Sequence, residues 1–353
     1  MKPKIISIGY AVPERSYTQE QVFSELRYDR RFWPLFRDSG IEKRHFWVPL
    51  EMVRSLSFQE QQEHYKEGAI ALSALAVENC LEGADVKGIG SLIFSSCTGF
   101  CPGPTVAHYL GHALNLPPQT YYLNIGSMGC EGGFPGVKRA ADFVAASGKP
   151  ALAVACELSS CSYFPEPDGR PDPENHYELA RSNSLFGDAA AAVLVGYDDD
   201  PRHPAILDTE SYTDTSYLGD LGYVWRDGRL RVLLSRRVPE IAPELVSIVV
   251  PRLLMRNGLG VGHISRWIIH AAGNQVLDNI RDRMGLSEDS LFFSRKILSL
   301  YGNCSSTSIG LVGKIMMEES APQEGEYGLV VSLGPGMTAG CTLLRWGGGI
   351  WRY

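Results

Sequence analysis

A cysteine at position 130 stands where the sequence predicts the end of a strand and the start of a helix. It closes the segment TYYLNIGSMGC, and EGGFPGVKRAADFVAASG follows it. A side chain at a helix N-terminus meets unpaired backbone N–H groups and the positive end of the helix dipole, which lower the pKa of a thiol. We therefore expect Cys130 to be a nucleophile, although most free cysteines are simply small, buried apolar residues.

Two polar residues in the second half of the chain are candidate partners for Cys130. His270 ends the apolar run in SRWIIHAAG, and ligands of α/β sheets gather at the carboxyl ends of strands. Asn303 lies in YGNCSSTS, where an asparagine can also cap a helix. A strand, a glycine-rich turn and a helix are predicted around both Cys130 and Asn303, which indicates duplicated halves that would bring these positions together.

Short β-branched runs alternate with helical patterns along the chain, which is typical of α/β architecture. Strands are predicted at Lys4–Ile8, Gly90–Phe94, Thr120–Ile125, Ala151–Ala155, Ala189–Val195, Arg266–Ile269, Tyr327–Leu333 and Cys341–Arg345. Helices are predicted at Phe58–Asn79, Thr105–Ala113, Val137–Ala146, Ala242–Arg256, Val276–Met284 and Ser308–Glu319. Pro165–Asn175, which is rich in proline and acidic residues, is predicted to be a loop.

The composition is that of an ordinary globular protein, with 353 residues and 44% hydrophobic content. A net charge of −7 argues against non-specific nucleic-acid binding, and only the basic stretches 43–45 and 226–237 could meet an anionic ligand. The eight cysteines form no CxxC pair and indicate no metal site. We find neither a signal peptide nor an apolar run of about 18 residues that could span a membrane. The expected location is the cytoplasm.

Six segments together carry a resemblance to a known family: CTGF (97–100), IGSMGC (125–130), LFGDAAAAVLVG (185–196), IIHAAG (268–273), GNCSS (302–306) and GPGMT (334–338). In order and spacing the chain resembles the condensing enzymes of the thiolase superfamily, and among them the type III polyketide synthases of the chalcone synthase kind. The resemblance runs from about Ile5 to Leu344. It implies a thiolase-like, five-layered α-β-α-β-α sandwich of two pseudo-duplicated halves, residues 1–183 and 184–353, and a homodimer.

The resemblance also implies an acyltransferase activity. Cys130 would take an acyl group from an acyl-CoA starter, and an ion pair with His270 would sustain its thiolate. His270 and Asn303 would then stabilise the enolate left by decarboxylation of malonyl-CoA, which extends the acyl chain and leads to a pyrone, resorcinol or related polyketide. Coenzyme A thioesters are the substrates, a carrier-protein thioester is an alternative donor, and no cofactor is implied.

Further positions take their roles from the same resemblance. Phe186 would gate the junction between the coenzyme A tunnel and the cavity, and the loop Gly334, Pro335 and Gly336 would shape the cavity near the thioester. Small side chains at cavity-lining positions indicate room for a long or bulky acyl chain; these are Ser159, Ser162 and Val232. Lys43 and Arg44 are the nearest match to the basic residues at the tunnel mouth.

Departures from the family pattern leave alternatives open. Ala271-Ala272-Gly273 stands where the family has Pro-Gly-Gly, and Glu131 follows the nucleophile where plant members carry an aromatic residue. A carboxylate so close to the sulfur opposes thiolate formation unless it points away or pairs with a cation. A ketoacyl-synthase-III-like enzyme that performs one condensation or joins two acyl chains also fits the residues. A non-catalytic acyl-binding partner subunit is the third interpretation.

Overall fold

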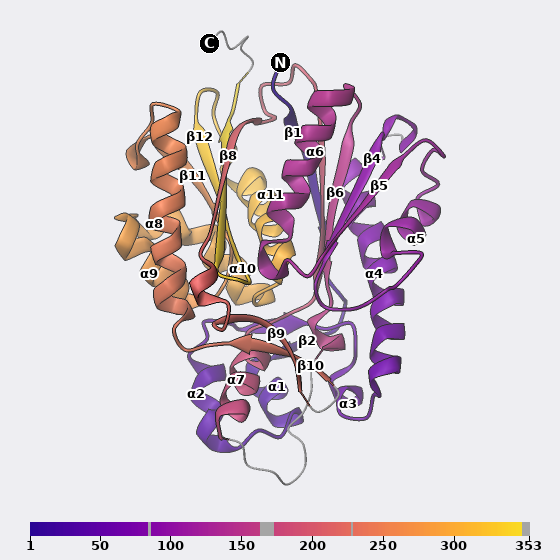
Figure 1. Cartoon of the computed structure of the whole chain (residues 1–353), viewed down its shortest axis with the longest axis vertical. Helices are drawn as coiled ribbons and strands as arrows, with labels where there is room; N and C mark the ends of the chain where they lie inside the picture. Colours follow the sequence, from indigo (N-terminus) through magenta and orange to yellow (C-terminus); the bar gives the residue numbers. More distant parts are fainter. Residues whose placement is uncertain (84–85, 163–172, 227–228, 348–353) are drawn as a thin grey trace.

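A nine-stranded mixed sheet runs through the computed structural model of the chain, which describes residues 1–83, 86–162, 173–226 and 229–347 (Figure 1). The strand order is β11-β12-β13-β8-β1-β7-β6-β4-β5. Strands β1 (Lys4–Ala11) and β8 (Ala205–Thr213) pair only through Lys4 and Ala205, so the sheet consists of two parts that meet at this one point.

Each part of the sheet contains strands predicted from the sequence. The first part adds to β1 the strands β4 (Ser91–Ser96), β5 (Tyr121–Gly126), β6 (Ala151–Glu157) and β7 (Ala189–Gly196). The second part adds to β8 the strands β11 (Ile264–Ile269), β12 (Tyr327–Gly334) and β13 (Thr338–Arg345). All eight predicted strands are confirmed. Strand β8 was not predicted, because its sequence AILDTESYT is mostly polar and only half-buried, without a long apolar run.

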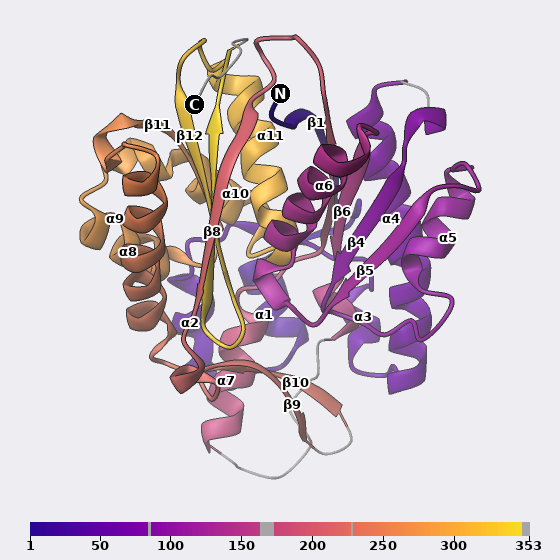
Figure 2. The ribbon, with the colours of Figure 1, turned by 45° about the horizontal axis from the view of Figure 1, so that its top comes forward.

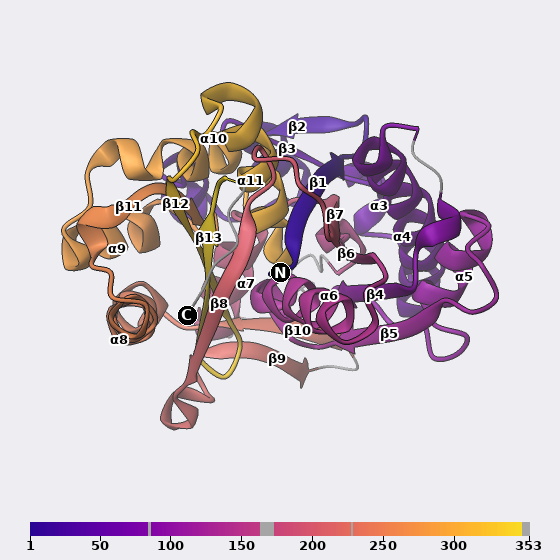
Figure 3. The same ribbon diagram turned by 90° about the horizontal axis from the view of Figure 1, so that it is seen from above.

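Helices form three layers around the two parts of the sheet (Figures 2 and 3). Between the parts lie α6 (Gly133–Ser147) and α11 (Ser308–Ser320), each in contact with strands of both. The outer layers are α4 (Phe58–Leu81) and α5 (Val106–Ala113) on one side, and α8 (Val238–Arg256) and α9 (Asn274–Met284) on the other. The predicted five-layered α-β-α-β-α sandwich is therefore confirmed.

The predicted halves, residues 1–183 and 184–353, stay a proposal. Strand β7 begins after position 184 but lies between β1 and β6 in the first part of the sheet. The chain thus passes from one part of the sheet to the other in the connection between β7 and β8, where the exposed turn DDDPRHP lies.

Shorter elements gather at one end of the sandwich, at the bottom of Figure 1. They include α1 (Gln19–Glu25), α2 (Trp33–Arg37), α7 (Pro173–Asn183), the pair β2 (Ser16–Thr18) and β3 (Lys43–His45), and the hairpin of β9 (Leu221–Arg226) and β10 (Arg229–Leu234). Helix α3 (Leu50–Val53) lies nearby, and α10 (Phe292–Tyr301) packs against α11.

The predicted loop Pro165–Asn175 is wrong at its end, because α7 already begins at Pro173, and proline is favoured in a first helical turn. Residues 165–172 of that prediction lie outside the described residues.

Candidate active site

Cys130 lies in a tight turn between β5 and α6. Residues Gly129–Glu131 form a 3₁₀ turn, and α6 begins at Gly133, so the predicted strand–thiol–helix arrangement is confirmed. Gly129 has φ +54°, and a Cβ there would lie 2.4 Å from Pro335. A Cβ at Gly334 would likewise lie 2.5 Å from the Cβ of Glu131. Only glycine permits this close packing of the Gly334–Gly336 loop against the turn that contains Cys130.

Three segments that are far apart in the sequence line one cavity, which has a volume of about 50 Å³. Cys130 comes from the turn before α6, and His270 directly follows the last residue of β11. The His270 N–H donates to the carbonyl of Val331 at 2.9 Å, which extends the pairing of β11 with β12. Asn303 comes from the segment between α10 and α11 and lines the same cavity.

Hydrogen bonds fix the amide of Asn303 in one orientation. Its Oδ1 accepts from the backbone N–H of Ser305 at 2.8 Å, and its Nδ2 donates to the carbonyl of Ala272 at 3.2 Å. An amide nitrogen carries two hydrogens, so one donor of Asn303 remains for a ligand. The backbone of Asn303 is held as well, because its N–H donates to Leu185 at 2.9 Å and its carbonyl accepts from Gly187 at 3.1 Å.

Burial determines the charge states of Cys130 and His270. Burial, together with a smaller effect of Glu157, raises the pKa of Cys130 to about 12 and outweighs a hydrogen bond from Ser305. Burial also lowers the pKa of His270 to about 4. Near neutral pH the two residues are therefore a thiol and a neutral imidazole. The predicted low thiol pKa and resting ion pair are wrong, because the loss of hydration outweighs the helix dipole.

Two glutamates lie close to Cys130 and differ in their surroundings. Glu131 is only 2% exposed, and its Oε2 has no hydrogen-bond partner among the described residues. Burial raises its pKa to about 7. Glu157, at the end of β6, was missed by the sequence analysis. Its carboxylate accepts the backbone N–H of Cys97 at 3.1 Å and the hydroxyl of Ser306. Glu157, and not Glu131, is among the causes that raise the pKa of Cys130.

A second cavity adjoins the first and contains the predicted cavity-lining residues. Ser159, Ser162 and Val232 line it together with Phe186, which also lines the cavity of Cys130. This position between two cavities suits the predicted gate. The second cavity has a volume of about 20 Å³, which is room for one water molecule. Among the described residues this cavity is smaller than a long or bulky acyl chain needs, and the expected space stays a prediction.

The two predicted tunnel-mouth residues have different surroundings. Lys43 is exposed. Arg44 is 0% exposed, and its guanidinium donates to the carbonyls of Asn183 at 2.7 Å and Phe186 at 2.8 Å. The prediction that Arg44 lies at the tunnel mouth is wrong. Its guanidinium is buried and bonded to backbone carbonyls, so it cannot bind a phosphate of coenzyme A. Sequence reasoning also missed Arg181 of α7, which lines the cavity of Cys130 and His270.

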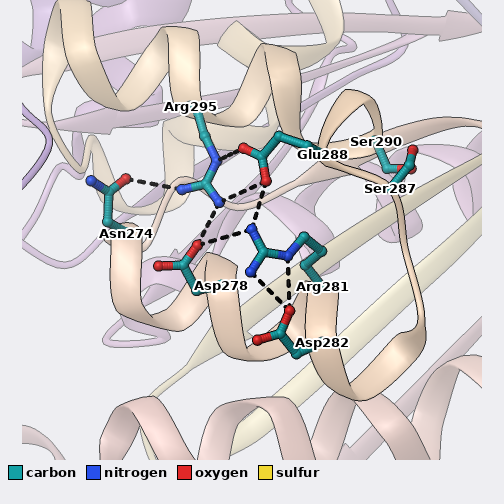
Figure 4. Close-up of polar contacts among 8 residues, drawn as sticks. All are labelled: Asn274, Asp278, Arg281, Asp282, Ser287, Glu288, Ser290 and Arg295. Carbon is teal, nitrogen blue, oxygen red and sulfur yellow. Dashed lines mark hydrogen bonds and ion pairs between the residues drawn. The ribbon is translucent and has the colours of Figure 1, made fainter.

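An ionic cluster on the surface holds the helix that follows His270 (Figure 4). Arg295 of α10 donates to Asp278 at 2.6 Å and to Asn274, the first residue of α9, at 3.2 Å. Glu288 accepts from Arg281 at 2.7 Å and also pairs with Arg295. These contacts tie α9 to α10, and thus fix the start of α9 just beyond His270.

Within the described ranges, no group of three or more His, Cys, Asp or Glu side chains is arranged to hold a metal ion. None of the helices in these ranges is both long and apolar enough to cross a membrane.

Comparisons with known proteins agree with the fold. The sequence model of the chalcone and stilbene synthases, C-terminal domain, matches residues 222–346. A 3,5-dihydroxyphenylacetyl-CoA synthase from Amycolatopsis balhimycina is 30% identical over 354 residues, with 97% of this chain and 93% of that protein covered. A phloroglucinol synthase from Pseudomonas fluorescens is 28% identical, with 95% and 96% covered.

A solved structure extends the likeness to three dimensions. The 1,3,6,8-tetrahydroxynaphthalene synthase of Streptomyces coelicolor, a bacterial type III polyketide synthase, superposes with a TM-score of 0.88 at 25% identity. The superposition covers 98% of this chain and 100% of that one. Since the similarity extends along nearly the whole sequence as well as the fold, the chain belongs to the type III polyketide synthases, the condensing acyltransferases that include the chalcone and stilbene synthases.

Proposed function

We propose that Cys130, His270 and Asn303 carry out a decarboxylative Claisen condensation between an acyl-CoA starter and malonyl-CoA. The observation that carries this proposal is that the three residues, from separate segments, line one cavity. The product would be a pyrone, a resorcinol or a related polyketide, and a carrier-protein thioester is an alternative acyl donor.

The first step loads the acyl group onto Cys130. Because burial keeps the thiol protonated and the imidazole neutral, His270 accepts the thiol proton as the sulfur attacks the thioester carbonyl. The carbon–sulfur bond to coenzyme A then breaks, and the leaving thiolate takes the proton from His270. Backbone N–H groups at the start of α6 are suited to hold the tetrahedral oxyanion.

The second step extends the chain by two carbons. Malonyl-CoA places its thioester oxygen near the free N–H of Asn303 and an N–H of His270, and loss of carbon dioxide leaves an enolate. The two donors stabilise its negative charge, and an amide donates without titrating. The enolate carbon attacks the acyl carbonyl, the bond to the Cys130 sulfur breaks, and a β-ketoacyl-CoA results.

Binding of coenzyme A requires cations at the cavity mouth. Arg236 and Arg237 are exposed and lie between Leu234 and Val238, which both line the cavity. Together with Lys43 they are our candidates for contacts with the coenzyme A phosphates.

We further propose that the protein is a homodimer that pairs through β5. Among the described residues, this strand ends the nine-stranded sheet and pairs with β4 alone. Tyr121 on β5 is 62% exposed, and Met128, just before Cys130, is 38% exposed. An unpaired strand edge with exposed apolar side chains favours association with a second copy. The cytoplasmic location stays a prediction.

The condensation is tested by incubating the protein with a panel of acyl-CoAs and isotope-labelled malonyl-CoA, followed by mass spectrometry of the products. We expect products with two or more extender units from wild type. Cys130→Ala should form no acyl-enzyme adduct, whereas His270→Ala and Asn303→Ala should retain some acylation but lose malonyl-CoA decarboxylation. A single β-keto product from wild type, or activity only with carrier-protein thioesters, would contradict the proposal.

A further inference from the structure

Arg181 places a positive charge in the wall of the catalytic cavity. It lies in the last turn of α7 and lines the same cavity as Cys130, His270 and Asn303. Much of the remaining lining is apolar and includes Leu185, Leu221, Leu234, Val238 and Val276. Arg181 is the one cation among the described residues that line this cavity.

The charge of Arg181 is not balanced by a carboxylate of the described residues. Among the described residues, its guanidinium makes one hydrogen bond, from Nη1 to the carbonyl of Ser235 at 2.9 Å, which leaves most of its five N–H donors without a partner there. Within the described part of the chain Arg181 forms no ion pair. Burial lowers its pKa, and the influence of nearby Glu178 is smaller. A partly desolvated guanidinium is costly unless it is paired, so this cavity favours an anion.

Ser235, which accepts from Arg181, is itself firmly held. Its hydroxyl donates to Asp220 at 2.6 Å, and its N–H donates to the Asp220 carbonyl at 2.8 Å. Asp220 also pairs with Arg237 at 3.4 Å. Because one side of the Arg181 guanidinium is anchored to this fixed turn, its remaining donors present a defined planar fork, and such a fork matches a carboxylate.

Two substrate carboxylates could bind Arg181: that of the malonyl extender, and one at the far end of a starter acyl group. They differ in whether their charge survives the reaction. The malonyl extender loses its carboxylate as neutral carbon dioxide, so a cation paired with it would stabilise the ground state more than the transition state and slow the step. A carboxylate at the far end of a starter acyl group keeps its charge throughout. A cation in the cavity wall can therefore bind the carboxylate of a starter without slowing the reaction, whereas binding the carboxylate of the extender would slow its decarboxylation.

We propose that Arg181 selects starters whose acyl group ends in a carboxylate, and that it binds this carboxylate while the thioester reaches Cys130. This inference rests on the proposed function, because it assigns the starter of the same site. The guanidinium takes part in no bond making or breaking. It is a specificity residue that orients one end of the starter.

The test compares starters of equal length with and without the terminal charge. Acylation of Cys130 is followed by intact-mass spectrometry, without malonyl-CoA, using glutaryl-CoA against pentanoyl-CoA and succinyl-CoA against butanoyl-CoA. We expect wild type to prefer at least one carboxylated starter. Arg181→Gln should lower kcat/KM for that starter about 10- to 100-fold, the range of a charged hydrogen-bonded pair, and leave its uncharged counterpart within about twofold. Arg181→Lys should recover part of the loss.

The matched control is Arg139→Gln, since Arg139 lies on the exposed face of α6, is 48% exposed and pairs with Asp142. Arg139→Gln should leave kcat/KM unchanged for both starters. An equal loss for both starters in Arg181→Gln and Arg181→Lys would show that Arg181 only supports the fold and would overturn the inference. Equal wild-type rates for charged and uncharged starters would also overturn it, while acylation of Cys130 would still support the proposed function. Absence of acylation by every starter would instead refute the proposed function.

Discussion

Cys130 and His270 line one cavity, and burial favours the neutral form of each. In the proposed reaction, nucleophilicity therefore arises during substrate binding. A thioester carbonyl at the cavity lets proton transfer to the imidazole and attack by the sulfur occur together. A sulfur with its pKa raised in this way is then a weak nucleophile toward reagents that do not place a carbonyl there. This property protects a reactive thiol from non-specific oxidation or alkylation.

The neutral pair makes a prediction about alkylation. Because burial raises the pKa of Cys130 to about 12, the thiolate fraction should rise about tenfold for each pH unit between pH 7 and pH 10. The rate of Cys130 carbamidomethylation by iodoacetamide should rise in the same way, as measured by peptide mass spectrometry that separates it from Cys101. Denatured protein is the control. A plateau near pH 6 to 7 would show a resting ion pair and contradict the prediction.

Glu131 makes a prediction about stability. Its pKa is about 7 in the folded protein against an ordinary value of 4.5, so the native state binds the proton more tightly than the unfolded state. The free energy of unfolding should therefore fall as the pH rises from about 5 to 7, and level off above the folded pKa. The loss attributable to Glu131 should reach at most about 3 kcal/mol.

The variant Glu131→Gln isolates this effect, because its side chain does not titrate. Denaturant unfolding of both proteins at pH 5 and pH 8 should show wild type losing more stability over this interval than the variant. The comparison is unaffected by any constant cost of burying the amide. If the free energy of unfolding changed equally in the two proteins, the Glu131 carboxyl would have to contact solvent or a cation in the folded state, and the prediction would be wrong.

At the scale of elements, the sequence predicts what depends on local pattern. Strands such as β6 and β7 are continuous apolar runs, because they are buried on both faces, and they were predicted nearly to their ends. The hairpin of β9 and β10 and the helix α10 were missed. Their side chains are of mixed polarity, and they form where the rest of the fold provides a surface.

The same distinction explains the site. The positions of Cys130, His270 and Asn303 at element ends follow from local sequence, and their meeting in one cavity was expected from the family resemblance. The location of Arg44 in the interior and of Arg181 in the cavity wall depends on contacts between distant segments. Arg44 bonds to Asn183 and Phe186, about 140 residues away, and no local pattern encodes that.

At the scale of the whole molecule, the open edge of β5 makes a prediction about assembly. Wild type should migrate with twice the 38.8 kDa mass of the chain in size exclusion with light scattering. The double variant Tyr121→Arg and Met128→Asp should shift it toward the single-chain mass, because charges at this edge disfavour strand pairing. Met255→Asp, at a methionine that is 74% exposed on α8, should leave the mass unchanged. A monomeric wild type at micromolar concentration would refute the homodimer.

The hydrogen bonds around Phe186 limit how this segment can move when a chain passes between the two cavities in the proposed reaction. Asn303 bonds to the residues on both sides of Phe186, and Arg44 holds its carbonyl at 2.8 Å. A swing of this segment would therefore pull the amide of Asn303 out of position. If Phe186 is the predicted gate, we expect it to open by rotation of the phenyl ring and not by movement of the backbone. Ring rotation is a local motion that leaves the catalytic geometry intact. In the proposed reaction, such a gate would let the growing chain pass between the cavities while Asn303 stays in place for the next extender.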